Sequence, residues 1–149
     1  MKDVRSEIEK YEQAHFDETM ETEQGFPCEP WWDAYLEAEA GGRLHLLTAR
    51  AGGELVGYHV SFLAPHMHSK SCFCAYVDRY YLAPEWRRGT NGIRLLKEAE
   101  KSLAELGIGK IYSGTSAKKD NSRLLEFLGY GMSDVMYSKV LYKKFPRMD

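Results

Sequence analysis

Hydrophobic residues recur at helical spacing near the start of the chain. Val4, Ile8 and Tyr11 fall on one face of a helix among many charged residues, which predicts a surface helix over residues 1–20. The Gly-Phe-Pro sequence at residues 25–27 is expected to break it. The chain is therefore expected to open with a helix rather than a strand.

The next segments pass from a helical pattern to strand-like runs. Residues 31–38 predict a second, short helix, which Gly41-Gly42 stops. Two apolar runs follow, at residues 44–49 and 55–63. A Gly-containing connection of hairpin length separates these two runs, so they predict an antiparallel hairpin. A polar loop is expected at residues 65–70.

The second half of the chain alternates between strand and helix patterns. A long run rich in Phe, Tyr and Val predicts a central strand that ends at Pro84. The predicted elements are a strand over 72–82, a helix over 92–106, a strand over 110–115, a helix over 121–128 and a strand over 135–145. This alternation implies a parallel crossover, whereas the early hairpin adds antiparallel strands. The predicted fold class is therefore α/β with a mixed sheet (α+β), mostly antiparallel and flanked by helices.

Composition and charge exclude several classes of function for this protein. The chain of 149 residues is expected to form one domain, residues 1–149. Its formal net charge of -2 gives no reason to expect nucleic acid as a partner, and no stretch is apolar enough to span a membrane. The first residues show no apolar run typical of a secretory signal, so a cytoplasmic protein is expected.

The three cysteines are not spaced as a metal site. Cys72 and Cys74 are two residues apart in an apolar run, and Cys28 is distant from both. Zinc binding with His66 or His68 is an alternative, but the usual C-x-x-C spacing is missing. We therefore predict no metal, reduced core thiols and solvated loop histidines.

The richest chemistry lies where the long strand meets the next helix. Arg87 and Arg88 precede Gly89 and Gly92 at the helix start. A helix N-terminus offers unpaired amides and a positive dipole end, and glycines let an anion approach the backbone. The arrangement predicts pyrophosphate binding, although it matches neither the dinucleotide fingerprint nor the P-loop. An ordinary solvated arginine pair is the alternative.

At these residues the sequence resembles the GNAT superfamily of acyl-CoA-dependent N-acetyltransferases. Residues 82–86 (Leu-Ala-Pro-Glu-Trp), residues 87–92 (Arg-Arg-Gly-Thr-Asn-Gly) and the pair Leu95-Leu96 align with the family pattern without a gap. The middle glycine of that pattern is Thr90 here, with a glycine one place earlier at Gly89.

A second element of the family pattern lies downstream. Asn121, Leu124 and the tripeptide Leu128-Gly129-Tyr130 fit it, but the tyrosine that many members use as general acid is Leu125 here. The resemblance extends over residues 72–145 by order and spacing.

The resemblance implies a fold and a cosubstrate. It implies a splayed sheet in which acetyl-CoA lies between two central parallel strands, with its pantetheine along the long strand and its pyrophosphate on the loop. The implied cofactor-binding residues are Tyr81, Leu82, Ala83, Arg87, Arg88, Gly89, Thr90, Asn91, Gly92 and Asn121.

The implied reaction needs a group that takes a proton from the attacking amine. Asp78 is the first candidate, because strand alternation is expected to point Asp78, Tyr80 and Leu82 to one side and the family often has an acid near this position. Tyr80 or Tyr130 is expected to return a proton to the thiolate.

Each of these roles has a structural alternative. His59, on the preceding strand, is the second candidate base, but such a histidine is more often a satisfied core residue. An acid in the position of Asp78 is often only paired with a neighbour such as Arg79. Asn121 has a residue type that favours capping of its helix whether or not cofactor is bound.

The acceptor side is indicated only by residue type. Trp31, Trp32 and Asp33 would form an acidic, aromatic wall suited to a cationic amine, whereas the alternative is one core and one surface tryptophan. We expect a small-molecule or peptide amine as acceptor, and the edge strands are compatible with a homodimer. Leu125 and Thr90 favour a competing hypothesis, an acyl-CoA-binding regulatory module with little or no transferase activity.

Overall fold

The structure, a computed structural model, describes residues 1–19 and 27–141. These residues form two compact units, and each is described by itself. The first unit comprises Met1–Tyr11 and Trp31–Gly114, and the second comprises Glu12–Pro30 and Thr115–Asp149. The sheet and the loop at residues 87–92 belong to the first unit.

The two helices expected before the first strand are confirmed. A short 3-10 turn, η1 (Lys2–Val4), leads into α1 (Arg5–Thr19), which begins in the first unit and continues in the second. Helix α2 spans Trp32–Ala40, and Gly41 follows it as expected. Two residues of the expected helix break, Gly25 and Phe26, lie outside the described residues.

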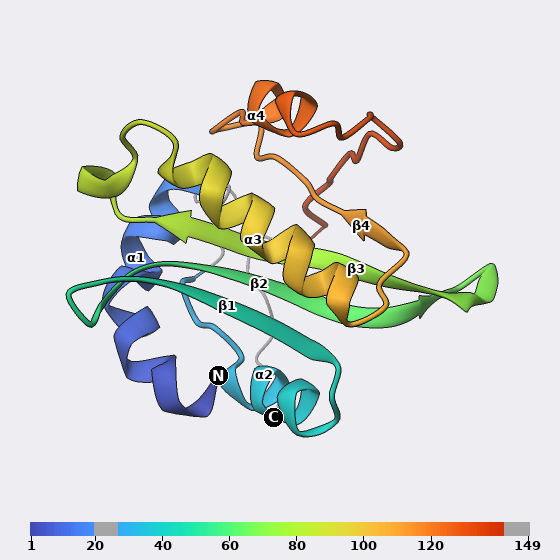
Figure 1. Cartoon of the computed structure of the whole chain (residues 1–149), viewed down its shortest axis with the longest axis horizontal. Coiled ribbons are helices and arrows are strands. Elements are labelled where there is room, and N and C mark those ends of the chain that lie inside the picture. Colours follow the sequence, from blue (N-terminus) through green and yellow to red (C-terminus); the bar gives the residue numbers. More distant parts are fainter. Residues whose placement is uncertain (20–26, 142–149) are drawn as a thin grey trace. The chain divides into compact units, whose positions relative to one another are not determined.

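Four strands form one mixed sheet (Figure 1). Strands β1 (Leu44–Ala51), β2 (Glu54–His66) and β3 (Ser69–Leu82) pair antiparallel in this order, and β4 (Lys110–Tyr112) pairs parallel to β3. The predicted mixed α/β class is confirmed, with the parallel pair reached through the crossover helix that follows β3.

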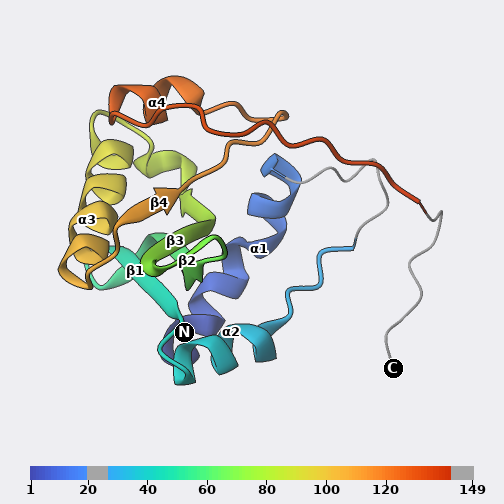
Figure 2. The same ribbon diagram turned by 90° about the vertical axis from the view of Figure 1, so that its right-hand side faces the viewer.

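The crossover helix α3 (Asn91–Glu105) covers one face of the sheet, while α2 and the first part of α1 cover the other (Figure 2). Helix α3 has an apolar stripe along one side and charged residues along the other. The apolar stripe packs against the sheet and is buried there. The buried residues of this stripe are Leu95, Leu96, Ala99 and Leu103. Gly107, with φ of 79°, ends the helix in a left-handed conformation that suits glycine.

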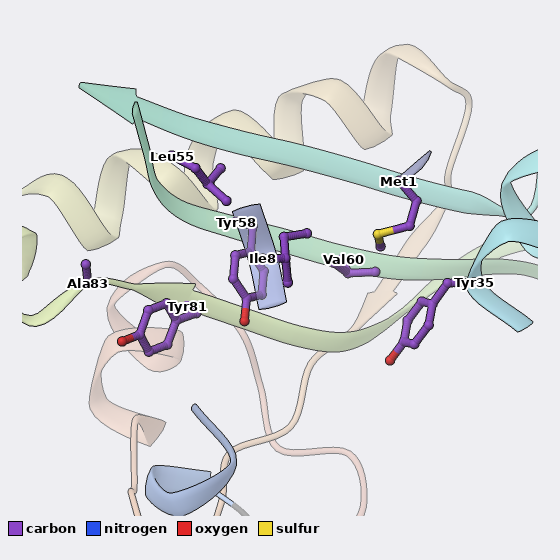
Figure 3. Close-up of a cluster of buried hydrophobic side chains, with 8 residues drawn as sticks. All are labelled: Met1, Ile8, Tyr35, Leu55, Tyr58, Val60, Tyr81 and Ala83. Carbon is purple, nitrogen blue, oxygen red and sulfur yellow. The ribbon is translucent and has the colours of Figure 1, made fainter. Parts of the chain in front are cut away.

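The larger core cluster lies on the face covered by α1 and α2 (Figure 3). Its buried members are Met1, Ile8, Tyr35, Leu55, Tyr58, Val60, Tyr81 and Ala83. Side chains alternate along β2, so Tyr58 and Val60 enter this core, whereas His59 and Ser61 point to the α3 face. Both faces of the central strand are therefore buried.

The connection between β2 and β3 is tighter than the predicted polar loop at 65–70. Strand β2 continues to His66 and β3 begins at Ser69, so only a short turn remains. The register shifts between Pro65 and His66, and Phe73 pairs with Pro65. Pro65 has no amide hydrogen to donate to β3, so the β2–β3 pairing is irregular at this residue. The two strands nevertheless continue past it.

The second unit joins the end of α1 to the segment before α4 (Ser122–Phe127). Ser116 Oγ donates to Thr19 O (2.6 Å), and Lys119 Nζ pairs with Glu18 Oε2 (2.5 Å). These contacts hold together two segments that are far apart in the sequence.

The predicted strand over 135–145 is wrong for the residues that are described. Residues 131–141 have no regular secondary structure, and the rest of the predicted range lies outside the described residues. Met136 and Tyr137 are 95% and 91% exposed. Strand propensity is largely a preference for packing beside a neighbouring strand, and this segment has no such neighbour in the described part of the chain. Within that part, no helix combines the length and apolar character needed to cross a membrane.

Candidate functional site

The loop between β3 and α3 is a compact turn with its own hydrogen bonds. A 3-10 turn, η3 (Pro84–Trp86), directly follows β3, and Trp86 N donates to Ala83 O (2.8 Å). Asn91 Nδ2 donates to Trp86 O (3.0 Å) and so links the start of α3 to this turn. Gly89 has φ of 58°, a conformation that favours glycine. The glycine at this position therefore sets the path of the loop into the helix.

The start of α3 presents free amide donors. Thr90 is the N-cap residue but makes no side-chain cap hydrogen bond. Within residues 1–19 and 27–141, five amides around the helix start donate to no backbone carbonyl. They belong to Arg88, Gly89, Thr90, Gly92 and Ile93. Such donors at the positive end of a helix dipole form a binding site for an anion.

The two arginines of the loop have different positions. Arg87 Nε donates to Leu82 O (2.6 Å), and its guanidinium lies over the Tyr81 ring at 5.2 Å. Arg87 therefore ties the loop to the end of β3, and it occupies a carbonyl that was expected to contact the cofactor. Arg88 is exposed beside the free amides, as is Arg94 one turn into α3. The sequence interpretation missed Arg94, although its place in the first helical turn was a usable signal.

The parallel pair covers only part of β3. The last β3–β4 pair is Tyr76 with Tyr112, whereas β3 continues to Leu82. Beyond Tyr76, β4 therefore does not cover this edge of β3. The edge leads directly to the loop, so the residues predicted to bind the pantetheine and the pyrophosphate follow one another along the first unit.

Asp78 lies at an irregularity that overturns the expected alternation. Val60 pairs with Arg79 and Ser61 pairs with Val77, so Asp78 is an extra residue in β3, a β-bulge. Asp78 therefore faces α2, whereas Tyr80 faces the other side of the sheet. The expectation that Asp78, Tyr80 and Leu82 share one side is wrong for this reason.

The carboxylate of Asp78 is held by two neighbours. Tyr35 OH donates to Asp78 Oδ2 (2.7 Å), and Arg79 Nε donates to the same oxygen (2.9 Å). Arg79 Nη2 also donates to Tyr35 OH (2.5 Å), and the guanidinium lies 5.2 Å from the Tyr35 ring centroid. Burial is the main cause that raises the pKa of Tyr35 above its usual range. The phenol therefore stays protonated and orients the carboxylate.

Tyr80 stacks against a buried histidine pair. The His59 and Tyr80 rings are nearly parallel with centroids 6.4 Å apart, and His45 lies 6.2 Å from His59 on the adjacent strand. Burial first, and the charge of His45 second, lower the pKa of His59 to about 4. Burial also lowers the pKa of His45, whose Nε2 is 2.8 Å from Ser102 Oγ. Sequence reasoning missed His45, because a single histidine in a strand carries no local signal.

Asn121 and Tyr130 belong to the second unit. Asn121 precedes α4 as the N-cap residue, but its side chain makes no cap hydrogen bond. Instead, Asp120 Oδ1 accepts from Ser122 N (2.8 Å), and Thr115 Oγ1 accepts from Asn121 N (2.6 Å). The expected capping role is thus filled by Asp120. The Asn121 and Tyr130 assignments remain predictions.

The two tryptophans Trp31 and Trp32 lie as the alternative to an acceptor wall predicts, with one on the core and one on the surface. Trp32 packs against the core cluster, and the Arg5 guanidinium lies 5.2 Å from its ring centroid. Trp31 is 68% exposed, and Asp33 is exposed in the first turn of α2. One tryptophan therefore lies on the core and the other on the surface.

Of the two histidines predicted to be solvated in the loop between β2 and β3, only one is exposed. His68 is exposed, but the half-buried His66 stacks with Tyr112 at a centroid distance of 6.2 Å. In residues 1–19 and 27–141, no group of three or more His, Cys, Asp or Glu residues is arranged to hold a metal ion.

The fold and the loop define an α/β protein in which a helix with free amides at its start follows the end of β3. The family model of the acetyltransferase (GNAT) family matches residues 2–130, so the chain belongs to that family. No curated protein matches the sequence.

Solved structures share the fold at low sequence identity. A transcriptional regulator from Bacillus halodurans C-125 is 20% identical with a TM-score of 0.73, over 92% of this chain and 95% of that one. A predicted acetyltransferase from Clostridium acetobutylicum, solved with acetyl-CoA, is 16% identical with a TM-score of 0.68, over 94% and 91%. An aminoglycoside acetyltransferase from an uncultured soil metagenomic sample, in complex with trehalose, is 16% identical with a TM-score of 0.67, over 91% and 87%.

Proposed function

We propose that this protein transfers the acetyl group of acetyl-CoA directly to a primary amine of a small molecule or peptide. The observation that carries the proposal is the set of free amides at the start of α3, flanked by Arg88 and Arg94, at the end of a β3 edge that β4 leaves uncovered. A pyrophosphate joined to an extended pantetheine fits such an arrangement. Family membership supports acetyl-CoA as the donor.

In the proposed reaction the amine nitrogen attacks the thioester carbonyl carbon, and the C–S bond breaks from the tetrahedral intermediate. Asp78 is the proposed base, and its Oδ1 takes the proton of the amine, because Oδ2 accepts from Tyr35 and Arg79. Tyr80 or Tyr130 returns a proton to the leaving thiolate. Holding both substrates along β3 supplies the proximity that lowers the barrier.

The binding half of the proposal is tested by calorimetric titration with acetyl-CoA. Gly92→Asp is the sharpest variant, because a Cβ at Gly92 meets nothing within 4 Å and a carboxylate in the first helical turn stabilises the helix. We expect this variant to fold normally and to lose acetyl-CoA affinity by about 10-fold or more through repulsion of the phosphates. Gly114→Asp, also without atoms within 4 Å of the added Cβ, is the control and should bind normally. Full affinity in Gly92→Asp would contradict the assignment of the loop.

The chemical half is tested by thiol release with a panel of amines. The proposal predicts CoA release with at least one primary amine and a lower kcat in Asp78→Asn than in the wild type. The kcat of Asp78→Asn is compared with that of Arg79→Gln, which keeps the Asp78 carboxylate and removes one of its hydrogen-bond donors. Binding of acetyl-CoA without turnover across the panel would favour the acyl-CoA-binding regulatory module. Full activity of Asp78→Asn at every pH would exclude Asp78 as the base.

A further inference from the structure

Two thiols lie side by side at the start of β3. Cys72 and Cys74 are separated by one residue, and their Sγ atoms are 3.8 Å apart. Both are free thiols, as is Cys28 of the second unit, but only Cys74 is buried, so the expected core position holds for Cys74 alone. The two sulfur atoms are therefore almost in contact, and a disulfide between them requires an oxidant that takes up two electrons and the two thiol protons.

The two thiols differ in exposure. Cys72 is half-buried and accessible to a small reagent, whereas Cys74 is 0% exposed. Burial is the main cause that raises the pKa of Cys74, so this thiol ionises less readily than an ordinary one, and a reagent in solvent reaches it less readily than Cys72. One accessible and one protected sulfur is the arrangement of an attacking and a resolving cysteine.

The backbone at Cys72 is not part of a regular ladder. Phe73 pairs with Pro65, and the next β2 pair is His66 with Ser69, so residues 70–72 have no partner on β2. Strand geometry separates the Cα atoms of Cys72 and Cys74 by about 6.6 Å, near the upper limit for a disulfide. The irregular segment lets Cys72 approach Cys74 without breaking the β2–β3 pairs beyond Phe73.

We propose that Cys72 and Cys74 form a redox-active dithiol that a small peroxide converts to an intrachain disulfide. The Cys72 sulfur attacks one peroxide oxygen, the O–O bond breaks, and a sulfenic acid and water (or an alcohol) form. The Cys74 sulfur then attacks the Cys72 sulfur, the S–O bond breaks, and the departing hydroxide leaves as water with the proton of Cys74. The peroxide is reduced by two electrons and the two thiols are oxidised by two. A bond held near its geometric limit is readily reduced, so a dithiol reductant restores the pair.

The disulfide has a local structural consequence. The carbonyl of Phe73, between the two cysteines, accepts the hydrogen bond of Gly109 N (2.9 Å), which leads into β4. Drawing the two sulfur atoms together bends the strand at Phe73 and weakens this bond. Oxidation is therefore expected to loosen the entry of β4 into the sheet.

The experiment treats the reduced protein with a small excess of hydrogen peroxide and analyses the tryptic peptide 71–79, which contains both cysteines. The expected product is this peptide lighter by two hydrogen atoms, restored by dithiothreitol, together with faster exchange of the Gly109 amide. A Cys28→Ser variant should behave like the wild type.

Two variants test the order of the steps. In Cys74→Ala the sulfenic acid of Cys72 has no resolving partner, so we expect it to be trapped by dimedone. In Cys72→Ser no dimedone adduct should form at Cys74. The proposal is overturned if oxidation yields only a sulfinic acid at Cys72, a disulfide to Cys28 or a disulfide between two chains, or if Cys74 is modified first.

Discussion

The two faces of the central sheet accommodate buried polar groups in opposite ways. On the face covered by α1 and α2, phenols enter an aromatic core and find acceptors. Tyr11 OH donates to Leu55 O, and Tyr35 OH donates to Asp78, each over 2.7 Å. The hydroxyl groups of both tyrosines are therefore satisfied by hydrogen bonds.

On the face covered by α3, the central strand instead carries imidazole groups and a hydroxyl. Nδ1 of His45, Nδ1 of His59 and Ser61 Oγ are buried without a hydrogen-bond partner in the described part of the chain. Such groups cost free energy, and the buried imidazoles resist protonation. One sheet therefore combines a face where the hydroxyl groups of Tyr11 and Tyr35 are hydrogen-bonded with a face whose buried imidazoles make its stability depend on pH. Four experiments test this difference.

The largest effect is expected from Tyr58→Ala on the aromatic face. Tyr58 is completely buried in the core cluster, so the substitution leaves a large cavity. We expect a loss of about 3–5 kcal/mol in the free energy of unfolding, measured by urea denaturation. Tyr137→Ala, at a site that is 91% exposed, is the control and should change stability by less than about 0.5 kcal/mol.

A smaller effect is expected from the pH dependence of the α3 face. The pKa of His59 is lowered from 6.5 to about 4 in the folded protein, so between these values the unfolded chain binds more protons. The contribution of neutral His59 to the free energy of unfolding is fully present above the pKa of His59 in the unfolded chain. It is lost as the pH falls toward the pKa of His59 in the folded protein, by up to about 3 kcal/mol.

His59→Gln should flatten this part of the stability curve, whereas His68→Gln, in the exposed hairpin, should keep the wild-type slope. Denaturation curves between these two pH limits provide the measurement. An unchanged slope in His59→Gln would mean that His59 is not the group responsible.

Removal of one hydroxyl tests whether the aromatic face depends on its hydrogen bonds. Tyr35→Phe removes the group that donates to Asp78 and accepts from Arg79. We expect a loss of about 2 kcal/mol, because these bonds involve charged partners. In a double-mutant cycle with Asp78→Asn, the two losses should be non-additive. Simple additivity would show that the hydroxyl and the carboxylate are not coupled.

The smallest effect is expected from Ser102→Ala on α3. Within residues 1–19 and 27–141, this variant removes the only hydrogen-bond partner of the His45 side chain, which lies 2.8 Å from Nε2. We expect a loss of about 1 kcal/mol, measured by thermal unfolding, with Ser69→Ala at the exposed hairpin as the control. A gain in stability would mean that the His45–Ser102 contact does not stabilise the α3 face.

The elements were predictable where their signals are local. The apolar stripe of α3, the glycines around it and the turn at Pro84 all lie within a few residues of the feature that they specify. The loop at residues 87–92 was recognised for the same reason, because free amides at a helix start follow from the chain order alone.

Other features depend on contacts between distant segments. The bulge at Asp78 is visible only when β2 is aligned beside β3, so alternation counted along one strand placed its side chain on the wrong face. Residues 135–141 carry strand-forming side chains, but a strand also needs a neighbour to accept its hydrogen bonds.

The sequence by itself determined the mixed α/β class, the order of the elements through α4 and the position of the glycine-containing loop at the start of α3, because hydrophobic periodicity and turn residues act locally. Only the tertiary structure decided that Arg87 binds the strand end, that Asp78 is held by Tyr35, and that His45 and His59 meet beneath α3. These contacts depend on strand register and on packing across many intervening residues, and no local pattern encodes either.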